Sequence, residues 1–366
     1  MHAVILAGGQ GTRLRPLTLA RRKELIPLLN RPLLEYRLRN LRQHGISHVA
    51  LACAQGTAEI EEHFGDGGTL GLQITYHYEE RPLGSGRAVK EAARAAGAEG
   101  RIIVCNGDIL TNVDLTAMIA RHEETGATLT MSLAPVDDPW SYGVVAVDDD
   151  LRIHRFVEKP PQGAEPSNLI NAGTWIWEPE VLERIPDDQS AVRDGYSERV
   201  LFPGLIEAGR RVQGFLEDLW VDVGSPERYL RAQRLLLSRS ISPGADGTAI
   251  VCARGVTIDP TAGIHGLVLL GEGAVVEAYA VIVGPTVIGP RACVRTGATV
   301  DASALWEDAR IGAGAVVAHS IIGANASVAD TARLFDAVLA DEARTERGAT
   351  PLPGARVDPG ATLARD

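Results

Sequence analysis

The chain has 366 residues, of which 45% are hydrophobic and 23% charged, and its formal net charge is -11. This length exceeds that of one ordinary hydrophobic core, so we expect two domains. The acidic balance argues against a nucleic-acid partner, and no apolar run is long enough to span a bilayer, so we expect no membrane partner. The cysteines stand far apart in apolar contexts, which favours buried free thiols in a reducing cytoplasm over disulfides or zinc ligands. They are Cys53, Cys105, Cys252 and Cys293.

The first predicted strand, residues 2–7, ends in glycines that are followed by cations. Glycine has no Cβ, so backbone N–H groups can approach a polyanion closely, and the cations neutralise its charge. The stretch is neither GxxxxGK[ST] nor GxGxxG, which excludes a P-loop and a dinucleotide fingerprint. It therefore indicates a phosphate-binding loop, although a plain strand-to-helix turn would use the same glycines. The residues in question are Gly8, Gly9, Gly11, Arg13, Arg15, Arg21, Arg22 and Lys23.

Short apolar runs alternate with amphipathic segments as far as residue 136. This alternation predicts a mostly parallel sheet covered on both faces, with ligands at the carboxyl ends of its strands. Asp108 follows one such strand and would lie at the same edge as the glycine-rich loop; it is either a helix or turn cap or a magnesium ligand beside substrate phosphates. The expected strands are 2–7, 49–53, 73–78, 102–105 and 128–133, and the expected helices are 33–44, 58–64, 85–96 and 115–125. Ser85 is the expected cap of the helix at 85–96.

After residue 135 the pattern changes to antiparallel pieces, 142–148 and 151–158. They lead into an EKP string at Glu158 and Lys159, which in isolation would be a solvated surface pair. Asp222 ends a later apolar run and precedes a helix expected at 226–237, so it could be a cap. A Ser/Pro/Gly-rich linker, 238–247, follows.

Beyond Gly247, bulky residues recur every six positions, and the residue four positions after each of them is almost always small. This period predicts a hexapeptide β-helix, whose open ends and flat faces favour oligomerisation. The register slips after Trp306, so we expect a bulge or loop at 306–312 and a further interruption at 341–353. The bulky positions are Ile258, Ile264, Leu270, Val276, Ile282, Ile288, Val294, Val300 and Trp306, and then Val316, Ile322, Val328 and Leu334.

These strings resemble, in content and order, those of the sugar-1-phosphate nucleotidylyltransferases. The resemblance covers nearly the whole chain and is strongest to the mannose-1-phosphate guanylyltransferases. It implies an α/β fold, with a Rossmann-like, mostly parallel sheet in a catalytic domain at 1–240 and a left-handed β-helix domain at 241–366. The strings that carry it are LAGGQGTRLRPLT, RPLGSG, NGD, YGVV, EKP, NAG and WVDVGSP.

The resemblance also implies a role for individual residues. Arg13, Lys23 and Asp108 would be catalytic, and Asp108 and Asp222 would bind Mg²⁺. The chain departs from the family at Glu24, where proline is usual, and at Arg87, where a small residue is usual. The nucleotide would contact Leu6, Ala7, Gly8, Gly9, Gly11, Thr12, Arg13, Glu80, Pro82, Gly84 and Ser85, and the sugar phosphate would contact Gly143, Glu158, Lys159 and Asn171.

The implied reaction joins a nucleoside triphosphate to a sugar 1-phosphate and releases pyrophosphate, with GTP and mannose 1-phosphate as the favoured pair. Transfer of a thymidylyl, uridylyl or adenylyl group to glucose 1-phosphate, or to a related sugar or cyclitol phosphate, stays open. A non-catalytic regulatory paralogue is a further alternative. An acyltransferase would need His265 or His319 as a base, and neither has companion residues. We expect a cytoplasmic homo-oligomer that assembles through the β-helix.

Overall fold

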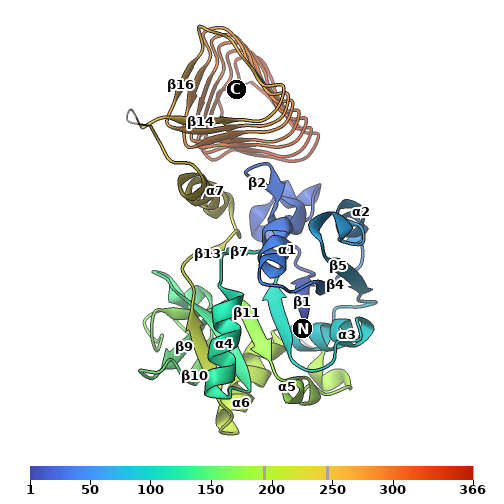
Figure 1. Cartoon of the computed structure of the whole chain (residues 1–366). Coiled ribbons are helices and arrows are strands. Elements are labelled where there is room, and N and C mark those ends of the chain that lie inside the picture. Colours follow the sequence, from blue (N-terminus) through green and yellow to red (C-terminus); the bar gives the residue numbers. More distant parts are fainter. Residues whose placement is uncertain (193–194, 245–246, 366) are drawn as a thin grey trace. The chain divides into compact units, whose positions relative to one another are not determined.

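The computed structural model describes residues 1–192, 195–244 and 247–365, which form two compact units (Figure 1). The sheet unit contains Met1–Gly9 and Leu33–Asp222. The solenoid unit contains Gln10–Pro32 and Val223–Asp366. The segment Gln10–Pro32, which carries most of the predicted phosphate-binding cations, thus belongs to the same unit as the C-terminal repeats.

The sheet unit is built on one nine-stranded sheet, ordered β10-β9-β11-β6-β1-β4-β5, with β8 beside β11 and β12 beside β8. The strands β6, β1, β4 and β5 run parallel, and β11 pairs antiparallel with β6. The predicted mostly parallel core is therefore confirmed. The strands are β1 (His2–Ala7), β4 (His48–Cys53), β5 (Gln73–Tyr78), β6 (Ile102–Asn106), β8 (Leu129–Pro135), β9 (Gly143–Val147), β10 (Ile153–Glu158), β11 (Leu169–Trp177) and β12 (Val212–Leu216).

The helices of this unit follow the predicted apolar spacing. In α3 (Ser85–Ala95) the buried residues Ala88, Val89, Ala92 and Ala93 recur at helical spacing, and the helix packs on β1 and β4. The Asp114 carboxylate caps α4 by accepting a hydrogen bond from the Ala117 N–H at 2.9 Å. The other helices are α1 (Leu33–Gln43), α2 (Ala58–Phe64), α4 (Leu115–Thr125), α5 (Pro179–Glu183) and α6 (Phe202–Glu207).

The solenoid unit contains three parallel sheets, and Figure 1 shows its coils stacked as three-sided turns. This arrangement is the predicted left-handed β-helix. A helix, α7 (Pro226–Ser240), precedes it and extends three residues beyond the predicted end. The first sheet contains β14 (Ala249–Cys252), β17 (Leu267–Leu270), β20 (Thr286–Ile288), β23 (Ala304–Leu305), β26 (Ile321–Ile322), β29 (Val338–Leu339) and β31 (Arg356–Val357). The second contains β15 (Thr257–Ile258), β18 (Val275–Val276), β21 (Cys293–Val294), β24 (Arg310–Ile311), β27 (Ser327–Val328), β30 (Arg344–Thr345) and β32 (Thr362–Leu363). The third contains β16 (Gly263–His265), β19 (Val281–Val283), β22 (Thr299–Asp301), β25 (Val316–Ala318) and β28 (Arg333–Phe335).

The register of the repeat changes one residue earlier than the sequence pattern predicts. Leu270 and Ile288, which pair across neighbouring coils, are 18 residues apart, whereas Ile288 and Leu305 are 17 apart. Leu305 therefore takes the inward position and Trp306 does not, so the prediction of an inward Trp306 is wrong. The expected bulge at 306–312 is also wrong, because β24 lies there and continues the ladder of β21 without a break.

The same shift changes the next predicted position. Val317 is fully buried in the solenoid core, whereas Val316 is only half-buried, so the prediction of an inward Val316 is wrong. The interruption expected at 341–353 is partly filled by β30, which pairs with β27 and β32. The ladder continues through these positions because each coil needs three inward positions, and a coil that is one residue shorter still supplies them.

The four cysteines are free thiols. Cys53 and Cys105 are buried, whereas Cys252 is exposed, so the expectation of burial is wrong for Cys252. Burial raises the pKa of the Cys105 thiol, which keeps it protonated at neutral pH. Within the described residues, no helix is both long and apolar enough to cross a membrane.

Candidate active site

The carboxyl ends of β1 and β6 lie side by side. Leu6 pairs with Asn106 in parallel register, and the Gly107 N–H donates to the Leu6 carbonyl at 2.9 Å. A Cβ on Gly107 would lie only 2.9 Å from that carbonyl oxygen, so this close approach of two backbones requires glycine. Half-buried Asp108 consequently stands next to the strand end from which Gly8 and Gly9 continue.

A two-stranded ribbon carries the two predicted metal ligands. Strand β7 (Ile109–Thr111) begins directly after Asp108, and β13 (Trp220–Asp222) pairs with it antiparallel, with Asp222 opposite Ile109. Asp222 is buried and Asp108 half-buried. The ribbon thus brings two carboxylates from distant parts of the sequence onto neighbouring backbone positions.

These two carboxylates fit a magnesium ion in their chemistry. Both supply hard oxygen donors, and Mg²⁺ keeps several waters and takes substrate phosphates as its remaining ligands. Among the residues that the structure describes, no group of three or more His, Cys, Asp or Glu side chains could hold a metal ion. A metal at this edge would therefore depend on the substrate for part of its coordination.

Buried polar groups that the sequence pattern did not mark support the ribbon. The Thr111 hydroxyl donates to the Glu217 carboxylate, and Arg37 Nη1 donates to Thr174 Oγ1 at 3.0 Å. Burial raises the pKa of Glu217 to about 8, against smaller opposing effects of the Thr111 hydrogen bond and the Arg37 charge. Nothing in the local sequence distinguishes Glu217 from a surface glutamate, because only the folded chain buries it.

The hairpin of β9 and β10 places two of the predicted sugar-binding residues opposite one another. Gly143 pairs directly with Glu158. A Cβ on Gly143 would lie 2.5 Å from Phe156 Cζ and 2.8 Å from Glu158 Oε2, so only glycine leaves room for the glutamate side chain. The Glu158 side chain is 16% exposed and that of Lys159 is 62% exposed, with 3.8 Å between Lys159 Nζ and Glu158 Oε1. Glu158 is thus not the fully solvated residue that an isolated surface pair would contain.

Asn171 lies on β11, next to β9 in the sheet. Its Oδ1 accepts hydrogen bonds from Trp175 Nε1 at 3.0 Å and from the Gly173 N–H at 3.2 Å, across an irregularity in the strand pairing. These bonds fix the orientation of the amide group. In the sheet, β11 lies between β9 of the hairpin and β6, the strand that precedes Asp108.

Trp220 links the ribbon to the sugar-binding strands. Its Nε1 donates to the Ala172 carbonyl at 3.0 Å, and its ring meets Tyr142 edge-on, with 5.1 Å between centroids. Because Trp220 is two residues before Asp222, this contact connects the predicted metal ligand to the NAG string.

The predicted base-reading segment precedes α3. Ser85, expected as the cap of this helix, is not its cap: the N-cap is Gly84, with φ +76°, and no side chain caps the helix. The Ser85 hydroxyl instead donates to Glu198 Oε2 at 2.9 Å and accepts from the Ser197 N–H at 3.1 Å. Ser197–Leu201 forms a π-helical turn, a geometry that often occurs at functional sites.

The remaining residues of this segment differ in exposure and contacts. Glu80 and Pro82 are exposed, and the Glu80 carbonyl accepts from Gln55 Nε2 at 2.7 Å. Arg87, which departs from the family pattern, donates to Glu91 Oε1 at 2.7 Å and to the Pro186 carbonyl at 2.9 Å. Its guanidinium is therefore held by α3 itself and by the loop after α5. No local sequence pattern marked Ser197 or Glu198 as a partner of Ser85.

The segment Gln10–Pro32 consists of short 3₁₀ turns, at Thr12–Leu14, Leu17–Leu19 and Lys23–Leu25. Gly11 has φ +58°, and its carbonyl accepts from the Leu14 N–H at 3.0 Å and from Thr18 Oγ1 at 2.8 Å. Thr12 and Arg13 are exposed, whereas Lys23 and Glu24 are only 5% and 1% exposed. Glu24, in the place of the family's proline, is thus accommodated inside the unit.

The predicted site residues divide between the two units. The sheet unit contains the strand ends, the predicted base-reading segment, the predicted sugar-binding residues and both aspartates. The solenoid unit contains three of the predicted nucleotide-binding residues, Gly11, Thr12 and Arg13, together with Lys23, which was predicted to be catalytic.

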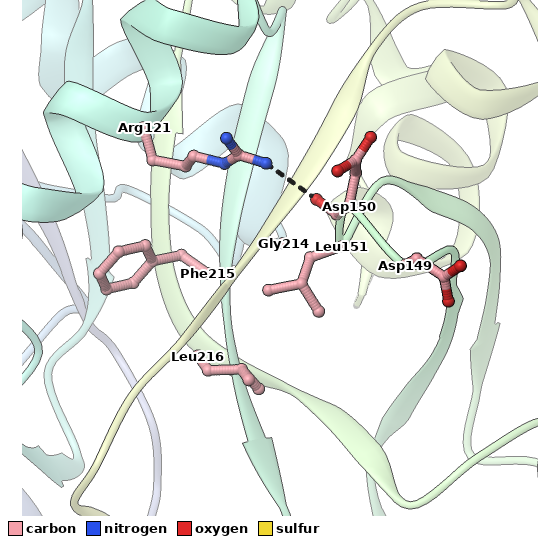
Figure 2. Close-up of a pocket in the computed structure, with 7 residues that line it drawn as sticks. All are labelled: Arg121, Asp149, Asp150, Leu151, Gly214, Phe215 and Leu216. Atoms are coloured by element: carbon pink, nitrogen blue, oxygen red, sulfur yellow. Dashed lines mark hydrogen bonds between the residues drawn. The ribbon is translucent and has the colours of Figure 1, made fainter.

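A hollow of about 390 Å³ lies elsewhere in the sheet unit (Figure 2). Arg121 Nη2 donates to the Asp150 carbonyl at 3.1 Å on one side of it. None of its lining residues belongs to the predicted site, and it faces the turn between β9 and β10 and the strand β12. The lining residues are Arg121, Asp149, Asp150, Leu151, Gly214, Phe215 and Leu216.

Comparisons with known proteins match both parts of the chain. Residues 2–239 match the nucleotidyl transferase family, and residues 253–364 match the GMPPB C-terminal domain. A mannose-1-phosphate guanylyltransferase of Mycobacterium tuberculosis is 35% identical over 320 residues, which cover 87% of this chain and 83% of that protein. A UTP--glucose-1-phosphate uridylyltransferase of Synechocystis sp. is 36% identical over 339 residues, covering 86% and 85%.

One solved structure supports the fold. It is a Bacillus anthracis protein, provisionally named a glucose-1-phosphate thymidylyltransferase, in complex with a sucrose. It matches with a TM-score of 0.58 at 22% identity, covering 67% of this chain and 97% of that one. At this identity the match supports the architecture alone.

Proposed function

Because the chain belongs to the nucleotidyl transferase family and is a sugar-1-phosphate nucleotidyltransferase, we propose that it joins GTP to mannose 1-phosphate, forming GDP-mannose and pyrophosphate. The observation that carries this proposal is the pairing of β7 with β13, which sets Asp222 opposite Ile109, the residue after Asp108. Trp220 of the same ribbon donates to β11, the strand of Asn171, and β11 lies beside the hairpin in which Gly143 pairs with Glu158. This is an arrangement suited to a phosphate-bound metal beside a polyol.

In the proposed reaction, a phosphate oxygen of the sugar 1-phosphate attacks the α-phosphorus of the triphosphate in line. A new P–O bond forms there, and the bond from the α-phosphorus to the oxygen that bridges to the β-phosphorus breaks, so that pyrophosphate leaves with that oxygen. The chain's residues position the reactants and neutralise charge, and no protein nucleophile is needed.

Individual residues would divide this work as follows. Arg13 would neutralise charge on the triphosphate, with Lys23 assisting there. Lys159, 62% exposed at the end of β10, would bind the acceptor phosphate while Glu158 and Asn171 bind its hydroxyl groups. Asp108 and Asp222 would hold Mg²⁺, which when bound stabilises negative charge on the phosphates.

The choice of base and sugar is supported by names of relatives, which do not agree. The guanylyltransferase of Mycobacterium tuberculosis and the uridylyltransferase of Synechocystis have nearly the same identity to this chain. The match of residues 253–364 to the GMPPB C-terminal domain favours GTP and mannose 1-phosphate. Glucose 1-phosphate with dTTP, UTP or ATP is the second candidate, supported by the Synechocystis relative.

The same proposal covers organisation and partners. We propose a catalytic domain at 1–240 and a β-helix domain at 241–366, with a homo-oligomer formed through the β-helix. The exposed hydrophobic side chains Tyr279 and Leu352 on the solenoid unit support such a contact. The free thiols support a reducing compartment, the cytoplasm.

A matrix assay tests the proposal. GTP, dTTP, UTP and ATP are each combined with mannose, glucose and N-acetylglucosamine 1-phosphates, and pyrophosphate release is measured with added Mg²⁺. We expect the highest kcat/KM with GTP and mannose 1-phosphate. A higher value with another pair replaces the substrate assignment, and no turnover with any pair favours a regulatory paralogue.

A further inference from the structure

Arg21, in the segment Gln10–Pro32, binds two carboxylates of the solenoid. Arg21 Nη2 lies 2.7 Å from Glu307 Oε1 and 3.2 Å from Asp341 Oδ2, and Arg21 Nε donates to the same Asp341 oxygen at 3.3 Å. The Arg21 side chain is 23% exposed, and those of Glu307 and Asp341 are 30% and 15% exposed. The guanidinium therefore binds two carboxylates in a largely covered position.

The coil geometry explains how one guanidinium reaches both carboxylates. Leu305, Ile322 and Leu339 pair across three successive coils, so Glu307, Ala324 and Asp341 occupy equivalent positions two residues later. Neighbouring coils are ~4.8 Å apart, which separates the two acidic positions by roughly twice that distance. The small Ala324 between them leaves room for the arginine. The Ala324 N–H donates to Asp341 Oδ1 at 2.9 Å, which leaves Oδ2 to accept from Arg21.

The Arg21 guanidinium also packs over the ring of Trp306. The Arg21 guanidinium carbon lies 5.3 Å from the centroid of the Trp306 ring, within the range of a cation–π contact. The indole Nε1 donates to Tyr229 Oη at 3.0 Å, and Tyr229 Oη donates to the Pro27 carbonyl at 2.6 Å. Trp306, which the register change places outside the solenoid interior, thus contacts Arg21 directly. Through Tyr229 of α7 it also contacts Pro27 indirectly.

A further contact lies near the end of the segment, where Asn30 Nδ2 donates to the Ile288 carbonyl at 3.1 Å. Arg21, Pro27 and Asn30 thus each attach the segment to the rest of its unit. Between them the backbone forms only 3₁₀ turns and the two-residue strands β2 (Pro27–Leu28) and β3 (Arg31–Pro32), which are weak elements by themselves.

Removal of Arg21 would leave the two carboxylates facing one another. Burial raises the pKa of Asp341, the Arg21 charge lowers it, and the Glu307 charge raises it. Without the guanidinium, the Glu307 charge and the burial of Asp341 would both disfavour ionisation of the Asp341 carboxyl group. Where the docked segment covers these carboxylates, Arg21 thus offsets their negative charge.

We propose that Arg21 is a positioning residue for the nucleotide, and that the solenoid, through Glu307, Asp341 and Trp306, holds the phosphate-binding segment in its working conformation. Arg21 is two residues from Lys23, whose side chain is 5% exposed and depends on the path of this backbone. The inference rests on the proposed function, in which Arg13 and Lys23 bind the triphosphate. It gives the solenoid a part in nucleotide binding besides any part in assembly.

The test is Arg21→Met in the full-length chain. Methionine keeps much of the apolar stem and removes the charge. We expect the KM for the nucleoside triphosphate to rise at least tenfold, while the KM for the sugar 1-phosphate changes less than twofold. Arg21→Lys, which keeps a charge without the fork geometry, should restore part of the loss. A merely structural role would lower the melting temperature without separating the two KM values.

The matched control is Arg291→Met. Arg291 pairs with Asp308 on the same solenoid but does not touch the segment, and we expect both KM values to stay within twofold of the wild type. Glu307→Gln with Asp341→Asn should reproduce the effect of Arg21→Met, and the triple variant should add nothing further, because all three changes break one contact.

Hydrogen exchange separates failure of this inference from failure of the proposed function. We expect amides of residues 10–32 to exchange faster in Arg21→Met, with the strands of the sheet unit unchanged. An active wild type with an Arg21→Met variant of unchanged triphosphate KM overturns the inference alone. If no substrate pair turns over, calorimetric titration of GTP replaces the KM, and equal GTP affinity in wild type and variant again overturns it.

Discussion

The two groups of predicted site residues are held in place by different means. In the sheet unit, Asp108, Asp222, Gly143, Glu158 and Asn171 lie on strands or at strand ends, so backbone pairing fixes their positions. In the solenoid unit, Arg13 and Lys23 lie on short turns that side chains attach to the β-helix.

The predicted site residues of one chain can therefore depend on two kinds of support. A backbone ladder tolerates many side-chain changes, because its hydrogen bonds are made by the main chain. A segment held by a few side chains is sensitive to each of them. We therefore expect changes at Asp108, at Asp222 and at the predicted sugar-binding residues of the sheet unit to affect the metal and the sugar phosphate, and changes at the solenoid contacts of Arg21 to affect the triphosphate.

The largest expected effect is that of Asp108→Asn, which tests the ribbon in the sheet unit. Loss of one of two metal carboxylates should lower the rate of NDP-sugar formation about 10³-fold, or ~4 kcal/mol of transition-state stabilisation. The rate is measured by pyrophosphate release at several Mg²⁺ concentrations. Asp114→Asn is the control, because Asp114 is a helix cap that asparagine can replace, and it should stay within twofold. An undiminished rate for Asp108→Asn would remove Asp108 from the metal site.

Leu305→Ala tests the solenoid as a support. Leu305 is fully buried, and its truncation should lower the free energy of unfolding by about 3 kcal/mol, measured by urea denaturation. Val316→Ala, at a half-buried position, should cost less than about 1 kcal/mol. Because Leu305 precedes Trp306, we also expect the triphosphate KM to rise while the sugar-phosphate KM stays unchanged. Equal costs for the two variants would contradict the register described above.

Glu217→Gln tests the buried polar groups beneath the ribbon through pH. The folded pKa of Glu217, about 8, lies above the ordinary value of 4.5, so the folded state keeps a proton that the unfolded state loses. Stability contributed by this group is therefore fully present below about pH 4.5 and is lost as the pH rises to about 8. The glutamine variant should lack this loss and be more stable than the wild type by ~2 kcal/mol at pH 9, allowing for the cost of burying the amide.

The measurement for Glu217→Gln is the free energy of unfolding across pH 5 to 9. The difference between variant and wild type should grow with pH and be smallest at the acid end. A difference that is constant across this range would show that Glu217 titrates normally in the folded protein.

Gly143→Ala has the smallest expected effect and is the counterpart of Arg21→Met. The added methyl group would meet Phe156 and Glu158, so the glutamate side chain must move. We expect the sugar-phosphate KM to rise roughly tenfold, or ~1.4 kcal/mol, with the triphosphate KM unchanged. Gly204→Ala, with open space around its Cβ position, is the control and should leave both values unchanged. A rise in the triphosphate KM alone would contradict the expectation that Gly143 affects binding of the sugar phosphate and not of the triphosphate.

Much of the fold could be predicted from the sequence. The β/α alternation predicted the parallel strands β1, β4, β5 and β6, and the six-residue period predicted the β-helix, because both patterns are repeated many times over. Single positions were less certain. Ser85 was expected to cap α3 but bonds to Glu198, and Trp306 was expected inside the solenoid but lies outside it. Each of these depends on a contact with a distant part of the chain, which no local pattern encodes.

The periodicities, the glycines at strand ends and the order of the motifs can be read from the sequence alone, because they follow from local geometry and side-chain chemistry. Folding of the whole chain sets which residues support one another. It paired Asp222 with the strand that follows Asp108, buried Glu217, and attached Arg21 to acidic residues about three hundred positions away. The physical reason is that burial and ion pairing are properties of contacts between distant segments, which form only when the whole chain has folded.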